Sequence, residues 1–254
     1  VVAVLVLAHN ITALLALPVL GLFALLALRR AGGSAGAARR VLALSAAGLL
    51  GLGASALYWL PALTERDLVQ HERLTTLFYD FHNHFQPLRE LVQCTLAFEY
   101  RYDALAGFLF KAGLVQIAAA SIGAALALWR LRHRRREVVF MAGLAVVGLF
   151  LLTSRSVWLW ETLPVLAFVQ FPWRMLSLVG LASVLLAAGG VAALGKSRGA
   201  TAAGVVLVGV WAAASFAGLR PALLELREEE VSRGALNRIE LDRRYVGTTT
   251  SGEY

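Results

Sequence analysis

The sequence has 254 residues, of which 59% are hydrophobic and only 16% are charged. Soluble domains carry about 25% charged residues, so most of this chain must contact lipid or other apolar helices. The formal charge of +8 does not indicate nucleic-acid binding, because the basic residues lie in short blocks between apolar runs. With Cys94 as its single cysteine, the chain can form neither an internal disulfide nor a cysteine-based metal site.

Six apolar runs predict membrane-spanning helices. A span needs ~20 apolar residues, because each residue adds about 1.5 Å and the hydrocarbon core is about 30 Å thick. The runs cover residues 1–28, 41–63, 104–128, 138–153, 175–195 and 201–219. All but 138–153 are long enough; that run needs the residues that follow it, or local thinning of the bilayer. We therefore expect an all-α fold, a polytopic transmembrane bundle with about six spans.

Arginine and lysine residues in three short loops predict the orientation of the bundle. The positive-inside rule places such loops in the cytoplasm, and the only acidic residue among them is Glu137. Residues 64–103, 154–174 and 220–254 then lie outside, and we expect a multi-pass protein of a bacterial inner membrane. The loop residues are Arg29, Arg30, Arg39 and Arg40, then Arg130, Arg132, Arg134, Arg135 and Arg136, and finally Lys196 and Arg198.

The outer segments are too long and too aromatic for plain linkers. Loops of about 40 residues without structure are uncommon, so we expect short interfacial helices over 68–78 and 88–98. Residues 154–174 predict a further helix lying on the membrane surface, with its tryptophans at headgroup depth. The chain opens at Val1 without a methionine and ends in a polar stretch. We expect a fragment of a longer protein, with 220–254 leading into a further domain.

Several polar residues stand at or near membrane depth, where they usually face a bundle or a cavity. His9 and Asn10 lie near the outer end of the first run. They either hydrogen-bond to neighbouring helices or line a substrate cavity. Lys111 lies within the third run, where it either snorkels to the interface or offers its charge to a lipid phosphate. Glu65 and Arg66 follow the second run as interfacial anchors or as cavity residues.

The sequence Asp80-Phe81-His82-Asn83-His84 contains residues of the metal-binding type. Two histidines at i and i+2 share a face on a strand but not on a helix. Asp80, His82 and His84, with His71, are candidate ligands for a divalent metal, although this spacing is not diagnostic of any metal. Ordinary loop packing is the alternative. No other cofactor is evident.

Gln170-Phe171-Pro172-Trp173-Arg174 precedes the fifth run and is the sharpest local signal. Proline is favoured at the start of a helix. Trp173 suits the outer interface and is also a candidate residue of a substrate cavity. Arg174 would project near a helix N-terminus, where its planar fork can bind a phosphate through two hydrogen bonds. A phosphate-bearing lipid is the natural ligand of such a site. Pairing of Arg174 with an acidic lipid or with Glu161 is the alternative.

Four segments together carry a resemblance to a known family: residues 59–63, the aromatic stretch 78–85, residues 163–166 leading into 171–174, and the tail 247–254. They resemble bacterial membrane proteins with the 6-pyruvoyl-tetrahydropterin synthase-related membrane domain. These proteins are similar to GT-C glycosyltransferases and to YfhO-like membrane proteins. The resemblance implies a polyprenyl-phosphate-linked sugar as the donor. It also implies a catalytic acidic residue upstream of Val1, with Arg174 in contact with the lipid phosphate.

Three functions follow as hypotheses. The first is a GT-C-like glycosyltransferase, or a close relative, that moves a sugar from a polyprenyl-phosphate carrier on the outer face. The second is a transporter or flippase of lipid-linked substrates, which often shows internal repeats and broken helices. The sequence contains no internal repeat, and its polar residues cluster toward the outer side, which favours outer-face chemistry. The third is a non-catalytic membrane assembly subunit.

Overall fold

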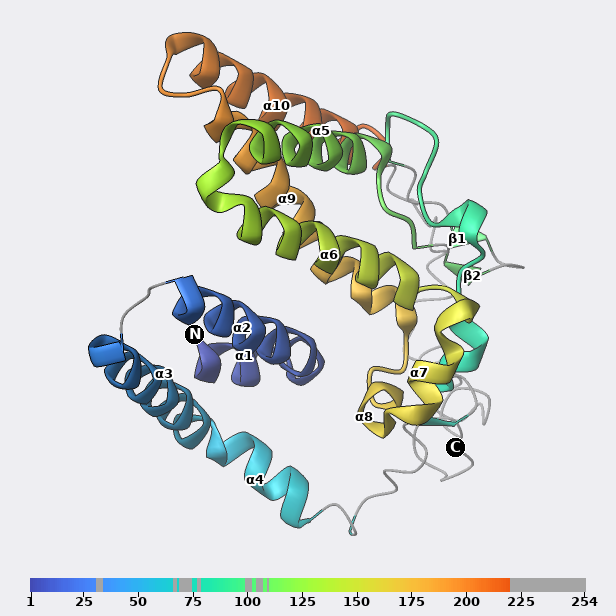
Figure 1. Ribbon diagram of the computed structural model, residues 1–254. Helices are drawn as coiled ribbons and strands as arrows, with labels where there is room; N and C mark the ends of the chain where they lie inside the picture. The colour runs from blue at the N-terminus through green and yellow to red at the C-terminus, as the bar shows by residue number, and fades with distance from the viewer. Residues whose placement is uncertain are drawn as a thin grey trace, which may run out of the picture. The chain divides into compact units, whose positions relative to one another are not determined.

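The computed structural model describes residues 1–30, 34–65, 68, 75–76, 79–98, 102–103, 107–108 and 110–219. These parts are almost wholly helical (Figure 1). The strands that they contain, β1 (Tyr102–Asp103) and β2 (Gly107–Phe108), form one antiparallel hairpin. The predicted outer segment 220–254 lies outside the described residues. The predicted all-helical class is therefore confirmed.

The first two apolar runs are each divided into two helices. Extended backbone at His9 (φ −165°, ψ 109°) separates α1 (Val2–Ala8) from α2 (Asn10–Arg30). Ser55 separates α3 (Ser34–Ala54) from α4 (Ala56–Thr64), and its buried hydroxyl donates to the Gly51 and Leu52 carbonyl oxygens at 3.0 Å. Serine competes in this way for helix carbonyls and bends helices. The uninterrupted helices predicted over 1–28 and 41–63 are thus replaced by broken ones.

The third and fourth runs form two helices of 17 residues that turn sharply between them. α5 (Leu114–Arg130) is followed by the 3₁₀ turn η6 (Arg132–Arg134) and by α6 (Arg135–Leu151), and the bend is 113°. Within the described residues, the run predicted over 104–128 becomes α-helical only at Leu114, because Lys111 and Ala112 pair with residues 90–93 instead. Ala112, for example, exchanges backbone hydrogen bonds with Leu91 and Gln93 at 2.8 and 2.9 Å.

The last two runs form helices close to their predicted bounds. The 3₁₀ turn η8 (Pro172–Met175) leads into α9 (Leu176–Ala193), and α10 (Arg198–Phe216) follows. Ser197 caps α10, with its hydroxyl accepting the Ala200 N–H at 3.1 Å, as Ser does at many helix starts. α9 packs against both α5 and α6 and lies behind them in Figure 1.

Several helices are long and apolar enough to span a membrane, as predicted. Four segments of the described chain meet this condition alone: Asn10–Arg29, Gly36–Ala54, Pro172–Ala193 and Arg198–Phe216. α5 and α6 meet it as a bent pair. Large apolar side chains are exposed on these helices, for example Leu50 on α3 and Val206 on α10. Such surfaces suit contact with lipid.

The segments that the sequence predicts to lie outside the membrane, here called the outer segments, are more irregular than predicted. Residues 154–174 form four short elements instead of one surface helix, since Pro164 and Pro172 each start a new one. These are η7 (Ser154–Ser156), α7 (Val157–Thr162), α8 (Pro164–Ala167) and η8. Of the helix predicted over 88–98, only η5 (Leu88–Glu90) forms. Most of 68–78 lies outside the described residues.

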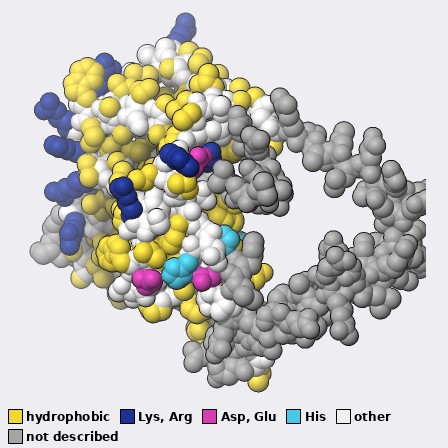
Figure 2. All heavy atoms as spheres, turned by 90° about the vertical axis from the view of Figure 1, so that its right-hand side faces the viewer, with side chains coloured by type: hydrophobic (Ala, Val, Ile, Leu, Met, Phe, Trp, Pro, Cys, Tyr) yellow, Lys and Arg dark blue, Asp and Glu magenta, His cyan; other side chains and the backbone are white. Residues whose placement is uncertain are grey.

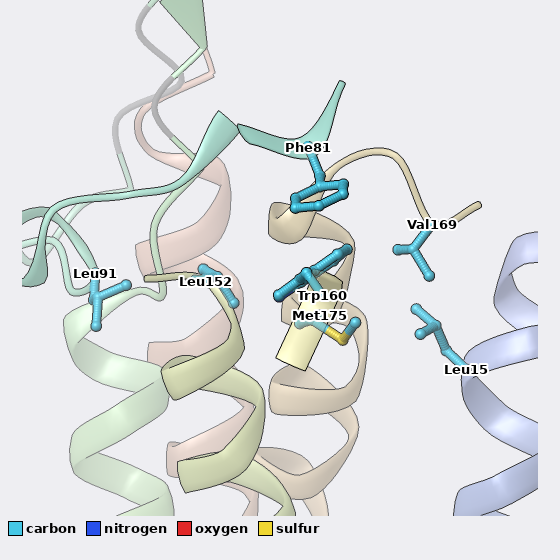
Figure 3. Close-up of a cluster of buried hydrophobic side chains, with 7 residues drawn as sticks. All are labelled: Leu15, Phe81, Leu91, Leu152, Trp160, Val169 and Met175. Atoms are coloured by element: carbon cyan, nitrogen blue, oxygen red, sulfur yellow. The ribbon is translucent and has the colours of Figure 1, made fainter. Parts of the chain in front are cut away.

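A hydrophobic cluster joins the outer segments to the helices (Figure 3). Trp160 of α7 is its centre, with 1% of its surface exposed. Its ring stacks on Phe81, which lies on η4 (Phe81–His84), at 5.4 Å between centroids. Leu15 extends the cluster from α2. The cluster therefore fixes both outer segments against the starts and ends of the long helices.

Candidate functional site

The site forms in the short turn between α8 and α9. Gln170 has a left-handed backbone (φ 65°), which is uncommon for a residue other than glycine. This reversal brings the Val169 carbonyl oxygen and the Gln170 side chain to Arg174. Arg174 Nη1 donates to these two oxygens at 2.7 and 3.0 Å. The turn therefore fixes the orientation of the guanidinium through these two hydrogen bonds.

Two aromatic rings also contact the guanidinium. Arg174 Cζ lies 4.8 Å from the centre of the Phe171 ring and 5.8 Å from that of Trp173, which is cation–π geometry. Trp173 in turn stacks on Phe110, with the ring centroids 4.0 Å apart and the planes 17° apart. His84 from η4 contacts the Phe171 ring edge-on at 4.7 Å. Three segments distant in sequence thus meet around Arg174.

Arg174 keeps its positive charge without an acidic partner in the part of the chain that the structure describes. Its hydrogen bonds there go to neutral oxygens and come only from Nη1. Glu161, which the sequence offered as a partner, instead lies 3.4 Å from Nε2 of His82. No described residue therefore accepts a hydrogen bond from Nε or Nη2 of Arg174. A half-buried guanidinium of this kind can bind a phosphate or carboxylate in a bidentate way.

A second polar group lies beside the aromatic cluster. His82 bridges two carboxylates, with Nδ1 2.6 Å from Asp80 and Nε2 3.4 Å from Glu161. Figure 2 shows histidine and acidic side chains together on the face turned toward the viewer, away from the row of basic side chains at the left edge. The hydrogen bond that His82 donates to the Asp80 carboxylate raises the pKa of His82 against a smaller opposing effect of burial. Burial raises the pKa of Asp80, but its hydrogen bonds with His82 outweigh this and lower the pKa overall.

The candidate metal ligands diverge in the structure. His82 turns to Asp80 and Glu161, whereas His84 packs on Phe171. Among the described residues, no three His, Cys, Asp or Glu side chains lie close enough to hold a metal ion. His71 lies outside the described residues. The geometry around Asp80 is that of a hydrogen-bonded loop, with the Asp80 side chain also accepting the His82 N–H at 3.0 Å.

Lys111 lies just before α5, at the level of the outer loop. Its ammonium group pairs with Glu90 of η5. The hydrogen bond from Lys111 lowers the pKa of the Glu90 carboxyl. The lysine predicted as a snorkelling or lipid-binding residue within a helix therefore ties η5 to the start of α5. It is adjacent to Phe110, through which it borders the Arg174 site.

The remaining predicted residues do not join this site. His9 Nδ1 accepts the Thr12 N–H at 3.1 Å, and Asn10 Oδ1 accepts the Ile11 N–H at 2.8 Å, so both serve the first turn of α2. Glu65 caps the end of α4 through its backbone N–H, which donates to the Pro61 carbonyl oxygen at 2.8 Å. Arg66 lies outside the described residues. Of the predicted binding residues, Arg174 and Trp173 thus form the site and Lys111 borders it.

Sequence reasoning gave Gln170 no role of its own within its motif and missed Phe110 altogether. Gln170 is an acceptor for Arg174 only because its backbone is left-handed, and nothing in the sequence signals that conformation. Phe110 lies in an apolar run that predicted a helix, and its neighbour Lys111 was the one hint that the run does not begin as a helix.

The chain matches no family model, no curated protein and no solved structure. The long apolar helices, which could span a membrane, are the structural observation that bears on the class of this protein.

Proposed function

We propose that this is an integral membrane protein of GT-C-like architecture that binds the phosphate of a polyprenyl-phosphate-linked sugar at Arg174 and transfers the sugar on the outer face. The observation that carries this proposal is the half-buried Arg174 guanidinium, which has no acidic partner among the described residues. A buried charge is costly unless it is paired. An anionic ligand would complete this site.

The proposed topology counts α5 and α6 as separate spans. Each has 17 residues, or about 26 Å at 1.5 Å per residue, close to the thickness of the hydrocarbon core. With α2, with the pair α3 and α4, and with α9 and α10, this gives about six spans. The turn at η6, between α5 and α6, is rich in arginine and would face the cytoplasm. Arg174 follows the segment that leaves the other end of α6, so it would lie outside.

The surroundings of Arg174 support a lipid-linked phosphate over a free one. The guanidinium is set among Phe171, Trp173 and Phe110, at the start of an apolar helix. A polyprenyl chain would contact the exposed apolar side chains of α9 and α10, such as Leu181 and Val205. The resemblance stated above names the same class of ligand. We assign the binding and positioning of the lipid-linked sugar to the described residues.

Lipid binding and sugar transfer are tested separately. The purified protein in nanodiscs is titrated with a polyprenyl phosphate, and Arg174→Gln is compared with Arg155→Gln. Arg155 is an exposed arginine of the same outer segment and serves as the matched control. We expect Arg174→Gln to weaken binding at least tenfold, Arg155→Gln to leave it unchanged, and Arg174→Lys to fall between them, because lysine lacks the fork.

The transfer assay uses a polyprenyl-phosphate sugar and an acceptor on the outer side of vesicles. Unchanged lipid affinity in Arg174→Gln would remove Arg174 from the site. Arg174-dependent binding with translocation of the lipid, but without a glycosidic product, would assign transport in place of transfer.

A further inference from the structure

A second candidate site lies at the opposite end of α6. A pocket of about 650 Å³ opens where α2 meets η6 and the first turns of α6. Arginines line one part of it: Arg132, Arg135 and Arg136. Apolar side chains line another: Leu26, Val139 and Phe140. The packing of Phe23 against Phe140, at 5.7 Å between ring centroids, joins the two helices beneath the pocket.

The pocket carries a net positive charge. Its three arginines are exposed, and within the described residues none of them has a carboxylate partner. Glu137 is the one acid that lines the pocket, beside His133. Three unpaired guanidinium groups in one pocket attract an anion that carries more than one oxygen acceptor.

The apolar side chains of the pocket favour a ligand that has an apolar part over a fully water-soluble ligand. Leu26 and Phe140 lie near the charged ends of α2 and α6, two long apolar helices, where a membrane surface would lie. An anionic headgroup near the arginines would place its acyl chains against Leu26, Val139 and the exposed apolar side chains beyond them. Basic pockets between transmembrane helices on the cytoplasmic side bind such headgroups.

We propose that this pocket binds the phosphate headgroup of an anionic phospholipid from the leaflet that contacts the arginine-rich loops. The site is independent of Arg174, which lies at the start of α9. Its role would be to fix α2 against α6, because the lipid would contact residues of both helices at once.

The test compares two variants with equal loss of charge from the same loop. Arg135→Gln/Arg136→Gln removes two pocket arginines. Arg130→Gln/Arg134→Gln is the matched control, because neither Arg130 nor Arg134 lines the pocket and each variant leaves three of the five arginines to set the topology. Delipidated protein in a zwitterionic detergent is titrated with phosphatidylglycerol, with phosphatidylcholine, and with soluble glycerol phosphate. Binding is followed by native mass spectrometry and by thermal stabilisation.

We expect phosphatidylglycerol to bind and to stabilise the protein, and the Arg135/Arg136 variant to bind it about thirtyfold more weakly, since each basic residue near an anionic headgroup contributes about fivefold. The control variant retains the wild-type affinity. An equal loss of phosphatidylglycerol affinity in the two variants would mean that only the overall charge of the loop matters, and it would overturn the proposal. Equal binding of phosphatidylcholine would also overturn it, and glycerol phosphate binding as tightly as the lipid would assign a soluble phosphate ligand instead.

Discussion

Gly190 of α9 and Gly123 of α5 are in backbone contact: a Cβ atom on Gly190 would lie 2.4 Å from the Gly123 Cα atom. A Cβ atom on Gly123 would lie 2.3 Å from the Leu186 carbonyl oxygen. The neighbouring buried residues Ala120, Ala127 and Ala187 are small as well. Small residues allow this approach in membranes, where helices associate through close packing because lipid is as apolar as their side chains.

Gly190→Ala should therefore separate α5 from α9 and destabilise the protein. Overpacking of a tight interface costs roughly 1–3 kcal/mol. Gly180→Ala on the same helix is the control, because a Cβ there meets nothing within 4 Å and alanine favours a helix by about 1 kcal/mol over glycine. Thermal unfolding in detergent measures both. A Gly190→Ala variant as stable as Gly180→Ala would show that the two backbones are farther apart.

Trp160 should be the most sensitive position in the outer segments. Trp160→Ala would leave a cavity under Phe81, and such changes cost about 3–5 kcal/mol. Trp160 Nε1 has no hydrogen-bond partner in the described structure, so Trp160→Phe removes a costly buried donor and should lose much less stability. Trp158→Ala is the control, because 56% of the surface of Trp158 is exposed. Chemical unfolding followed by fluorescence separates the three.

His82 should make the stability of the outer loop depend on pH. Its pKa is raised in the folded protein, so its contribution is complete below the unfolded value of about 6.5 and disappears as the pH rises through the folded pKa. The pKa of Asp80 is lowered, so its contribution is present above about 3.9 and disappears on acidification. Both therefore act together between about pH 4 and 6.5, and for such exposed groups the effect is roughly 0.2–1 kcal/mol.

Hydrogen exchange of residues 79–85 at pH 5.5 and pH 8.5 measures this effect. We expect stronger protection at pH 5.5, a loss of the difference in His82→Gln, and its retention in His84→Gln. Stronger protection at pH 8.5 would contradict the assigned ion pairs.

Gln170→Gly should weaken ligand binding without lowering the stability of the protein. Glycine adopts the left-handed backbone of position 170 without the cost of roughly 1–2 kcal/mol that other residues incur, so stability should be kept or increased. The variant loses the Oε1 acceptor of the 3.0 Å bond from Arg174. We expect a several-fold lower affinity for polyprenyl phosphate together with an unchanged or higher melting temperature. A loss of stability would show that the side chain of Gln170 matters more than its backbone.

The sequence predicted the long helices because apolar length is a strong signal. It also singled out Arg174 and Trp173, because proline, tryptophan and arginine at a helix start each have a local physical meaning; the structure brings the two side chains together, and their role stays a prediction. The sequence-based prediction failed where contacts within the folded chain decide the local structure. His9 and Ser55 break helices that hydropathy alone reads as continuous, and Lys111 pairs with Glu90, 21 positions away in the sequence. The spacing of His82 and His84 suggested shared ligation, but packing on Phe81 and Phe171 sends the two rings apart.

The glycine contact also bears on how the molecule can work. Arg174 precedes α9 directly, and α9 is locked to α5 along its buried face. A helix held backbone to backbone resists sliding and rotation by itself. In the proposed function, Arg174 would therefore bind its ligand from a fixed position and not as part of a moving gate. In the proposed function, motion that admits or releases the ligand would then come from the surrounding loops or from the broken helices at His9 and Ser55.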